Sequence, residues 1–351
     1  MSQRIDKNMA QNGRIRVAVD AMGGDYAPEE VVKGAVLAAK RDDVEILLVG
    51  STDILEKGLA KCKFTANGSS IRVVEASEVI KETESPVDVI RHKPNCSVAV
   101  AAKMVKSGEA DALVSAGSSA AAAVSAIQFM GMVDGIGRPA IVGSLGGFAP
   151  NTVLVDLGAN ADCKPQHFLT FAIVGSVYAK KFLNITDPKI GLLNTGSEEN
   201  KGSETGREAY ALLKDSGLNF VGNIEGNDIL NGKANVIVCG GLVGNVILKF
   251  YESIAGHAKD WTVQKMRKYP PLDVLVKLLF DGLFPATKIS GDSEKRGGGI
   301  LWGVDGVVRI AHGASRAPQI ANAIESAKEA VEAEVVESLK SELAKFSQGG
   351  K

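Results

Sequence analysis

Five short segments of the sequence combine glycine with small polar residues, and each follows a short apolar run. They are residues 20–25 (DAMGGD), 115–119 (SAGSS), 156–160 (DLGAN), 194–198 (NTGSE) and 239–245 (CGGLVGN). Glycine lets the backbone approach a ligand closely, and a helix that begins behind such a loop points its free amides at an anion. We therefore predict a polar, anion-binding cleft formed by these loops.

One lysine follows the fourth loop closely. Lys201 comes shortly after Gly196 and is preceded by acidic residues. A cation is unfavourable at the start of a helix. Lys201 is therefore either an ordinary solvated side chain or a group that holds a phosphate and neutralises charge during a reaction. His312, beside a glycine, is expected to be structural more often than catalytic. Four carboxylates are candidate bases or helix caps: Asp20, Asp25, Asp156 and Asp162.

Several common site motifs do not fit this sequence. Segment 196–202 has its lysine before the second glycine, which differs from a nucleotide-binding P-loop, and the near match to a dinucleotide fingerprint at 135–140 contains a proline at the expected start of a strand. Ser118 and Ser119 stand in AGSSA, which is not a nucleophile elbow. The scattered histidines and cysteines form no short-range metal pattern, so we expect neither a metal nor an organic cofactor.

The elements that would position these loops alternate between strands and helices. Strands are expected at 15–20, 44–49, 71–75, 111–115, 139–144, 152–156, 189–193 and 236–239, and helices at 28–39, 166–182, 202–214 and within 315–346. This alternation predicts βαβ units and hence an α/β protein with a mainly parallel sheet. In such sheets ligands bind beyond the carboxyl ends of the strands. The uncharged stretch 112–133 is long enough to span a bilayer, but small polar residues interrupt it, and we predict a strand, a turn and a helix there.

The composition restricts the class of protein. The 351 residues include 40 Lys+Arg and 41 Asp+Glu, for a net charge of −1, which argues against a nucleic-acid partner. The length suggests two domains. Residues 1–14 lack the apolar core of a signal peptide and are expected to be a disordered tail. The four cysteines, none close to another, indicate a reducing cytoplasm: Cys62, Cys96, Cys163 and Cys239.

Segment 251–284 differs from the rest of the chain in its amino-acid composition. Basic residues gather at 259–268, a Pro-Pro pair follows, and 272–284 is apolar except for a narrow polar stripe. The apolar part is too short to span a bilayer. It is either a helical hairpin packed against a partner subunit or one that docks on a membrane surface, with basic residues near the lipid headgroups. The two alternatives can coexist.

Taken together, the glycine-rich loops closely resemble the PlsX family, the acyl-carrier-protein-dependent phosphate acyltransferases of bacterial phospholipid synthesis. The resemblance covers about residues 15–325 through long, co-linear motifs. These are VAVDAMGGD and APE within 17–29, ADALVSAG at 110–117, GANADC at 158–163, GLLNTGSEENKG at 191–202, NFVGNIEG at 219–226, VGNV at 243–246 and AHG at 311–313.

The resemblance implies a three-layer α/β/α fold like that of isocitrate and isopropylmalate dehydrogenases and of phosphotransacetylases. It implies one subdomain formed by 15–145 with 290–346 and a second formed by 146–289, which carries the hairpin at 251–284. It also implies a homodimer that associates peripherally with the inner face of the plasma membrane. The implied reaction converts long-chain acyl-acyl carrier protein and inorganic phosphate to acyl phosphate and free carrier, without an enzyme nucleophile, metal or cofactor.

The resemblance also assigns residues. Lys201 would grip phosphate, and Asn245 would donate to the developing oxyanion. The rest of the cleft would be lined by Asp20, Gly24, Asp25, Ser115, Gly117, Ser118, Ser119, Asn160, Asn194, Gly196 and His312.

The sequence departs from the family pattern in three places in these loops. Ser118, Ser119 and Ala120 stand where the family commonly has Asn-Thr-Gly, Asn227 stands where it has arginine, and Gly240 where it has aspartate. Two alternatives therefore stay open: a phosphotransacetylase-like acyl transfer with coenzyme A, and a non-catalytic acyl-ligand or membrane-bound regulator.

Overall fold

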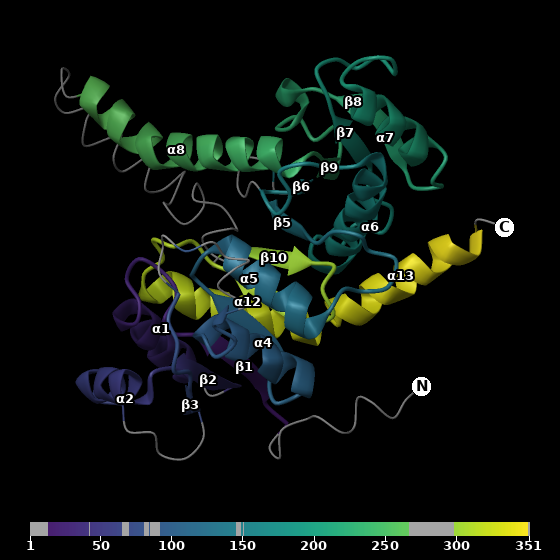
Figure 1. Ribbon diagram of the computed structural model, residues 1–351. Coiled ribbons are helices and arrows are strands. Elements are labelled where there is room, and N and C mark those ends of the chain that lie inside the picture. The colour runs from purple at the N-terminus through teal and green to yellow at the C-terminus, as the bar shows by residue number, and fades with distance from the viewer. Residues whose placement is uncertain are drawn as a thin grey trace. The chain divides into compact units, whose positions relative to one another are not determined.

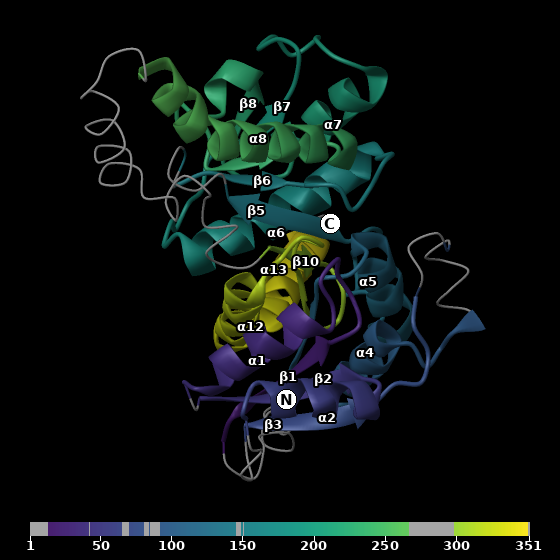
Figure 2. The same ribbon diagram turned by 90° about the vertical axis from the view of Figure 1, so that its left-hand side faces the viewer.

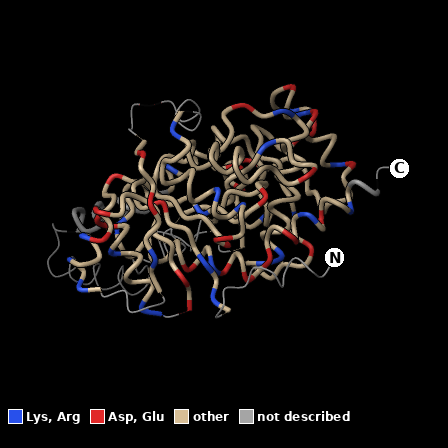
Figure 3. Tube along the Cα trace, turned by 60° about the horizontal axis from the view of Figure 1, so that its bottom comes forward, with Lys and Arg blue, Asp and Glu red and all other residues tan. Residues whose placement is uncertain are grey.

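The computed structural model describes residues 13–349 apart from 42, 65–69, 81–83, 85–91, 145–148, 150 and 267–297. The chain divides into two units, residues 1–139 with 296–351 and residues 140–295. The expected tail at 1–14 and the apolar part of the expected hairpin lie almost entirely outside the described residues. Basic and acidic residues are interspersed along the described chain (Figure 3).

Unit 1 is a parallel sheet covered by helices on both faces. Its elements are β1 (Ile15–Asp20), α1 (Glu29–Ala39), β2 (Val44–Gly50), α2 (Thr52–Lys61), β3 (Ile71–Glu75), α4 (Ser97–Ser107), β4 (Ala112–Ser115), α5 (Ser119–Ser125), a π-helix (Ala126–Met130), β10 (Gly299–Trp302), β11 (Val307–Ile310), α12 (Ala317–Glu332) and α13 (Val335–Gly349). The strand order is β3-β2-β1-β4-β11-β10, and only β10 runs antiparallel to its neighbour. Helices α1 and α12 pack together over one face while α4 covers the other (Figures 1 and 2).

Unit 2 repeats this layering around a smaller sheet. Its elements are β5 (Ala140–Ser144), β6 (Val153–Val155), α6 (Pro165–Phe182), β7 (Ile190–Leu193), α7 (Glu204–Lys214), β8 (Phe220–Ile224), a 3₁₀ turn (Gly226–Asp228), β9 (Val236–Val238) and α8 (Gly241–Met266). The strand order is β5-β6-β9-β7-β8, with β5 antiparallel.

Alternating side chains bury both faces of the unit 2 sheet. A Cβ on Gly175 of α6 would meet the side chains of Val155 and Val236, so these two face α6. Leu154 and Ile237 point to the other face, where the inner side of α8 packs against them. The sheet is therefore covered by helices on both sides, as the predicted α/β/α layering requires.

All eight predicted strands are present, and the stretch 112–133 forms the predicted strand, turn and helix. Three further strands were not predicted: β8, β10 and β11. One expected loop was wrong in a way that affects the site. Helix α8 begins at Gly241, so Asn245 lies on a helix and not in a loop. Helix α7 begins at Glu204 instead of at 202, and Lys201 precedes it as predicted.

Candidate active site

Three loops of unit 1 leave the same edge of its sheet. Asp20 at the end of β1 is in register with Ser115 at the end of β4, and Ser115 is in register with Ile310 at the end of β11. The three parallel strands therefore deliver the loops 20–25, 115–119 and 311–316 side by side. The β1 loop is bonded to the β11 loop, since the Asp25 amide donates to the Gly313 carbonyl at 2.9 Å.

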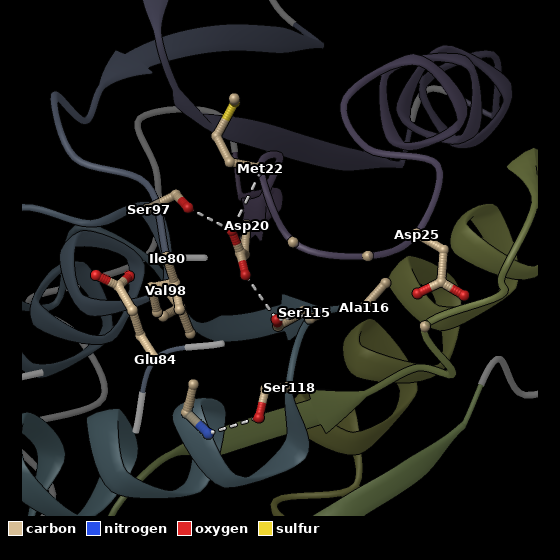
Figure 4. A pocket seen from close by; sticks show the side chains of 15 residues that line it. Asp20, Met22, Asp25, Ile80, Glu84, Ser97, Val98, Ser115, Ala116 and Ser118 are labelled. Carbon is tan, nitrogen blue, oxygen red and sulfur yellow. Dashed lines mark hydrogen bonds between the residues drawn. The ribbon is translucent and has the colours of Figure 1, made fainter. Parts of the chain in front are cut away.

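The Asp20 side chain connects three segments at this edge of the sheet through hydrogen bonds. Its carboxylate accepts hydrogen bonds from Ser97 Oγ at 2.5 Å, from Ser115 Oγ at 2.7 Å and from the Met22 amide at 3.3 Å (Figure 4). Ser115 Oγ in turn accepts from the Gly117 amide at 3.1 Å. Asp20 is almost fully buried, and this burial raises its pKa, although the serine and backbone donors oppose the shift.

The two Gly-rich loops touch backbone to backbone beside Asp20. A Cβ on Gly23 would lie 2.9 Å from the Gly117 amide nitrogen, and Gly24 has a φ of +116°. Any side chain at Gly23 would therefore separate the β1 and β4 loops, and only glycine adopts the Gly24 conformation without strain.

These loops border a cavity of about 380 Å³, which is within the range of small-molecule sites. Ile80 and Glu84 lie on its side opposite Asp25 (Figure 4). The described lining consists of Asp20, Met22, Gly23, Gly24, Asp25, Ile80, Glu84, Ser97, Val98, Ser115, Ala116, Gly117, Ser118, Ala121 and Gly313.

The described lining contains carboxyl groups but no lysine or arginine. Asp20, Asp25 and Glu84 are its ionisable members, and Glu84 is paired with Lys93 at 2.7 Å. Ser118 caps α5, because its Oγ accepts from the Ala121 amide at 3.4 Å. A site with this charge balance suits an uncharged ligand better than a free phosphate.

In unit 2, a second buried carboxylate shapes the loop after β6. Asp156 is fully buried and accepts five N–H groups. The donors are the amides of Ile141, Gly158, Ala159 and Asn160 and the side-chain Nδ2 of Asn160, at 2.8–3.2 Å. Asn160 is thus engaged with Asp156, and a Cβ on Gly241 at the start of α8 would lie 2.6 Å from Asp156 Oδ2. The first turn of α8 therefore packs directly on this loop.

Asn245 stands on that first turn of α8, beside the loop. A Cβ on Gly158 would lie 3.2 Å from Asn245 Cβ and 3.5 Å from its Oδ1. The Asn245 side chain is half-buried and makes no hydrogen bond to any residue that the structure describes. Its amide is therefore available to donate to a ligand.

Two asparagines fold the loop that carries Lys201. Asn194 Nδ2 donates to the Lys201 carbonyl and to Asn223 Oδ1, both at 3.1 Å, and Asn223 Nδ2 donates to the Glu198 carbonyl at 2.8 Å. The lysine stem crosses Gly196, since a Cβ there would lie 3.0 Å from Lys201 Cγ. A side chain at Gly196 would therefore require the stem of Lys201 and the carboxylate of Glu198 to shift.

The ammonium group of Lys201 is only weakly engaged. Its Nζ lies 3.8 Å from Glu198 Oε1, and the two side chains are 51% and 61% exposed. Such a pair contributes between nothing and about 1 kcal/mol, so a phosphate can displace Glu198 at little cost.

The structure distributes the predicted site residues between the two units. Unit 1 brings Asp20, Gly24, Asp25, Ser115, Gly117 and Ser118 to its cavity. Ser119 is exposed at the start of α5 and His312 is exposed next to Gly313, and neither lines the cavity. In unit 2, loops that carry Asn160, Asn194, Gly196 and Lys201 follow the carboxyl ends of the parallel strands β6 and β7. Asn245 lies on α8, which follows the carboxyl end of the strand between them, β9.

Sequence reasoning missed the residues that hold these loops. Ser97 and Asn223 have no local signal, because each bonds to a residue distant in sequence. Asp156 was predicted to be a base or a helix cap, and its five N–H partners show that it holds the conformation of the loop after β6.

Cys239 is not a nucleophile, because burial raises its thiol pKa far above the ordinary value. Within the described chain no group of three or more His, Cys, Asp or Glu is arranged to hold a metal ion.

The fold is shared with solved acyl-transfer enzymes. A phosphotransacetylase from Streptococcus pyogenes aligns with a TM-score of 0.61 and 20% identity over 93% of this chain and 96% of its own. A branched-chain phosphotransacylase from Enterococcus faecalis aligns with a TM-score of 0.52 and 15% identity over 90% and 99%. These similarities confirm the predicted three-layer α/β class.

Sequence comparison then gives the family. The family model described as "Fatty acid synthesis protein" matches residues 15–338. A phosphate acyltransferase of Pelotomaculum thermopropionicum is 44% identical over 94% of this chain and 95% of its own, and one of Desulfitobacterium hafniense is 43% identical over 95% and 99%. The chain belongs to the PlsX family of phosphate acyltransferases, as the loop motifs predicted.

Proposed function

We propose that the protein transfers the acyl group of a long-chain acyl-acyl carrier protein to inorganic phosphate, releasing acyl phosphate and the free carrier for phospholipid synthesis. The observation that carries this proposal is the Lys201 loop. It places a half-exposed, weakly paired ammonium group at the carboxyl edge of a parallel sheet. A phosphate at that edge is the anion expected for such a group.

In the proposed reaction orthophosphate itself is the nucleophile. A phosphate oxygen attacks the thioester carbonyl carbon, a C–O bond forms, and the carbonyl electrons move onto oxygen. The oxyanion then collapses, the C–S bond breaks and the thiolate leaves. The thiolate takes up, through water, the proton that the attacking hydrogen phosphate gives up. Lys201 holds the phosphate, and the free Nδ2 of Asn245 donates to the oxyanion. Positioning and charge stabilisation therefore supply the catalysis.

The three departures from the family pattern lie on the surface of their units or have room around them. Ala120 is exposed in the first turn of α5, and Asn227 is exposed in the 3₁₀ turn after β8. A Cβ on Gly240 would meet no atom within 4 Å. Since none of the three distorts a described loop, the proposal keeps the catalytic assignment.

We also propose a peripheral, homodimeric protein that docks on the inner face of the plasma membrane through segment 251–284. Support comes from the part of α8 that leads into this segment. Leu242, Val246, Phe250 and Ile254 recur every four residues, and their side chains are exposed. That spacing gives one apolar stripe along the helix. None of the described helices combines the length and hydropathy needed to cross a membrane.

The proposed function is tested by turnover with separate acyl donors. We expect phosphate-dependent release of thiol from long-chain acyl-acyl carrier protein and much slower release from acyl-coenzyme A. Faster turnover with the coenzyme A donor would instead support the phosphotransacetylase-like alternative. Tight lipid binding without turnover of either donor would support the regulator.

A further inference from the structure

The unit 1 cavity has the wrong charge for the phosphate and the wrong polarity for a hydrocarbon chain. Its described lining carries three carboxyl groups and no lysine or arginine, so no cationic side chain there would attract a phosphate. Its volume of about 380 Å³ equals that of roughly a dozen water molecules, which is far larger than one orthophosphate needs. An acyl chain would remove water from the carboxyl groups of Asp25 and Glu84 without replacing its hydrogen bonds, which is unfavourable.

The polar groups of the lining are arranged to bind amides. Ser97 lines the cavity and its Oγ donates to Asp20 Oδ1, which leaves the lone pairs of Oγ able to accept from an N–H group. Ser118 Oγ accepts from the Ala121 amide, which leaves its own hydrogen to donate to a carbonyl. Met22 and Val98 add apolar surface to the lining. The lining thus combines a hydrogen-bond acceptor, apolar surface and a donor.

We infer that this cavity binds the uncharged, amide-bearing pantetheine arm by which the acyl thioester is attached to its carrier. The inference rests on the proposed function, because only a thioester donor brings such an arm. The arm contains two amide groups separated by short aliphatic spacers, so it can use both the polar and the apolar groups of the lining. In this assignment Asp20 is a positioning residue: it fixes Ser97 and Ser115 and does not touch the reacting atoms.

The test uses reduced pantetheine as the probe and the full-length protein. Ile80→Trp fills the cavity from its rim, and Val79→Trp is the matched control, because Val79 is 44% exposed and does not line the cavity. We expect Ile80→Trp to weaken pantetheine binding by about tenfold or more, with the KM for the acyl donor raised and the KM for phosphate unchanged. Val79→Trp should bind as the wild type does.

A measurement on the wild type keeps the test valid if Ile80→Trp does not fold. In saturation-transfer NMR, pantetheine signals should persist when orthophosphate is added at high concentration. Displacement of pantetheine by phosphate, or equal pantetheine affinity in a folded Ile80→Trp variant, overturns the inference. Those results would leave phosphate-dependent turnover intact. Loss of phosphate dependence with pantetheine binding retained would overturn the proposed function instead.

Discussion

Replacing Lys201 by alanine is expected to remove most phosphate-dependent turnover and leave the fold intact. The only ion pair that the structure describes for its ammonium group is to Glu198 at 3.8 Å, with both side chains more than half exposed. Losing that pair changes the free energy of unfolding by at most about 1 kcal/mol. Losing a group that stabilises developing charge costs about 2.7–4 kcal/mol, or roughly 10²–10³ in kcat.

The assay follows release of the carrier thiol at saturating acyl donor while phosphate is varied, and denaturant unfolding checks stability. Lys214→Ala is the matched control. Lys214 lies in the same unit, is 57% exposed, and pairs with an exposed Glu199 at 3.1 Å. Both variants should have similar unfolding midpoints, and only Lys201→Ala should lose activity. Turnover by Lys201→Ala within about threefold of the wild type, or an equal loss in Lys214→Ala, would refute the reasoning.

Three further predictions concern the loops and the apolar segment. Gly244→Ala should destabilise the protein by about 1–3 kcal/mol in urea unfolding, because its Cβ would overlap the Asp156 carbonyl oxygen, whereas Gly240→Ala should be nearly neutral. As pH rises above about 4, Asp20→Asn should lose less stability than the wild type does, with stability measured as the urea concentration at the midpoint of unfolding. The double variant Leu275→Glu with Leu279→Glu should bind anionic lipid vesicles less in a sedimentation assay.

The sign of the pH effect follows from the direction of the pKa shift. Burial raises the folded pKa of Asp20, so the unfolded chain loses this proton first as pH rises. The protonated Asp20 carboxyl makes its full contribution to the free energy of unfolding below the unfolded pKa of about 3.9. That contribution is lost as pH rises towards the folded pKa. If stability falls with pH equally steeply in Asp20→Asn and in the wild type, this reasoning is contradicted.

The other two predictions have their own contradicting outcomes. These are a Gly244→Ala variant as stable as the wild type, and unchanged vesicle binding by the double leucine variant.

The fold could be predicted from sequence because its main signals are local. Each of the eight predicted strands is a short β-rich run that ends at a turn residue, as at Asp20, and alternation with helices sets the parallel topology. Among the missed strands, β11 pairs in register with β4, which lies far away in the sequence. A local sequence pattern cannot show that pairing.

The site was predicted in part for the same reason. The Gly-rich loops are visible in the sequence, but the bonds that shape them are not. Ser97 reaches Asp20 across 77 positions, and Asn223 reaches Asn194 across 29. The assignment of Lys201 and Asn245 came from family resemblance and stays a prediction. The structure adds that both side chains are available to a ligand.

The central claim is that orthophosphate attacks the thioester directly. The most direct measurement incubates the wild-type protein with long-chain acyl-acyl carrier protein and ¹⁸O-labelled phosphate, and quantifies free thiol, acyl phosphate and any acylated protein by mass spectrometry. The account predicts one labelled acyl phosphate for each thiol released, no acylated protein, and no thiol release without phosphate. A burst of thiol without phosphate, together with acylated protein, would contradict it.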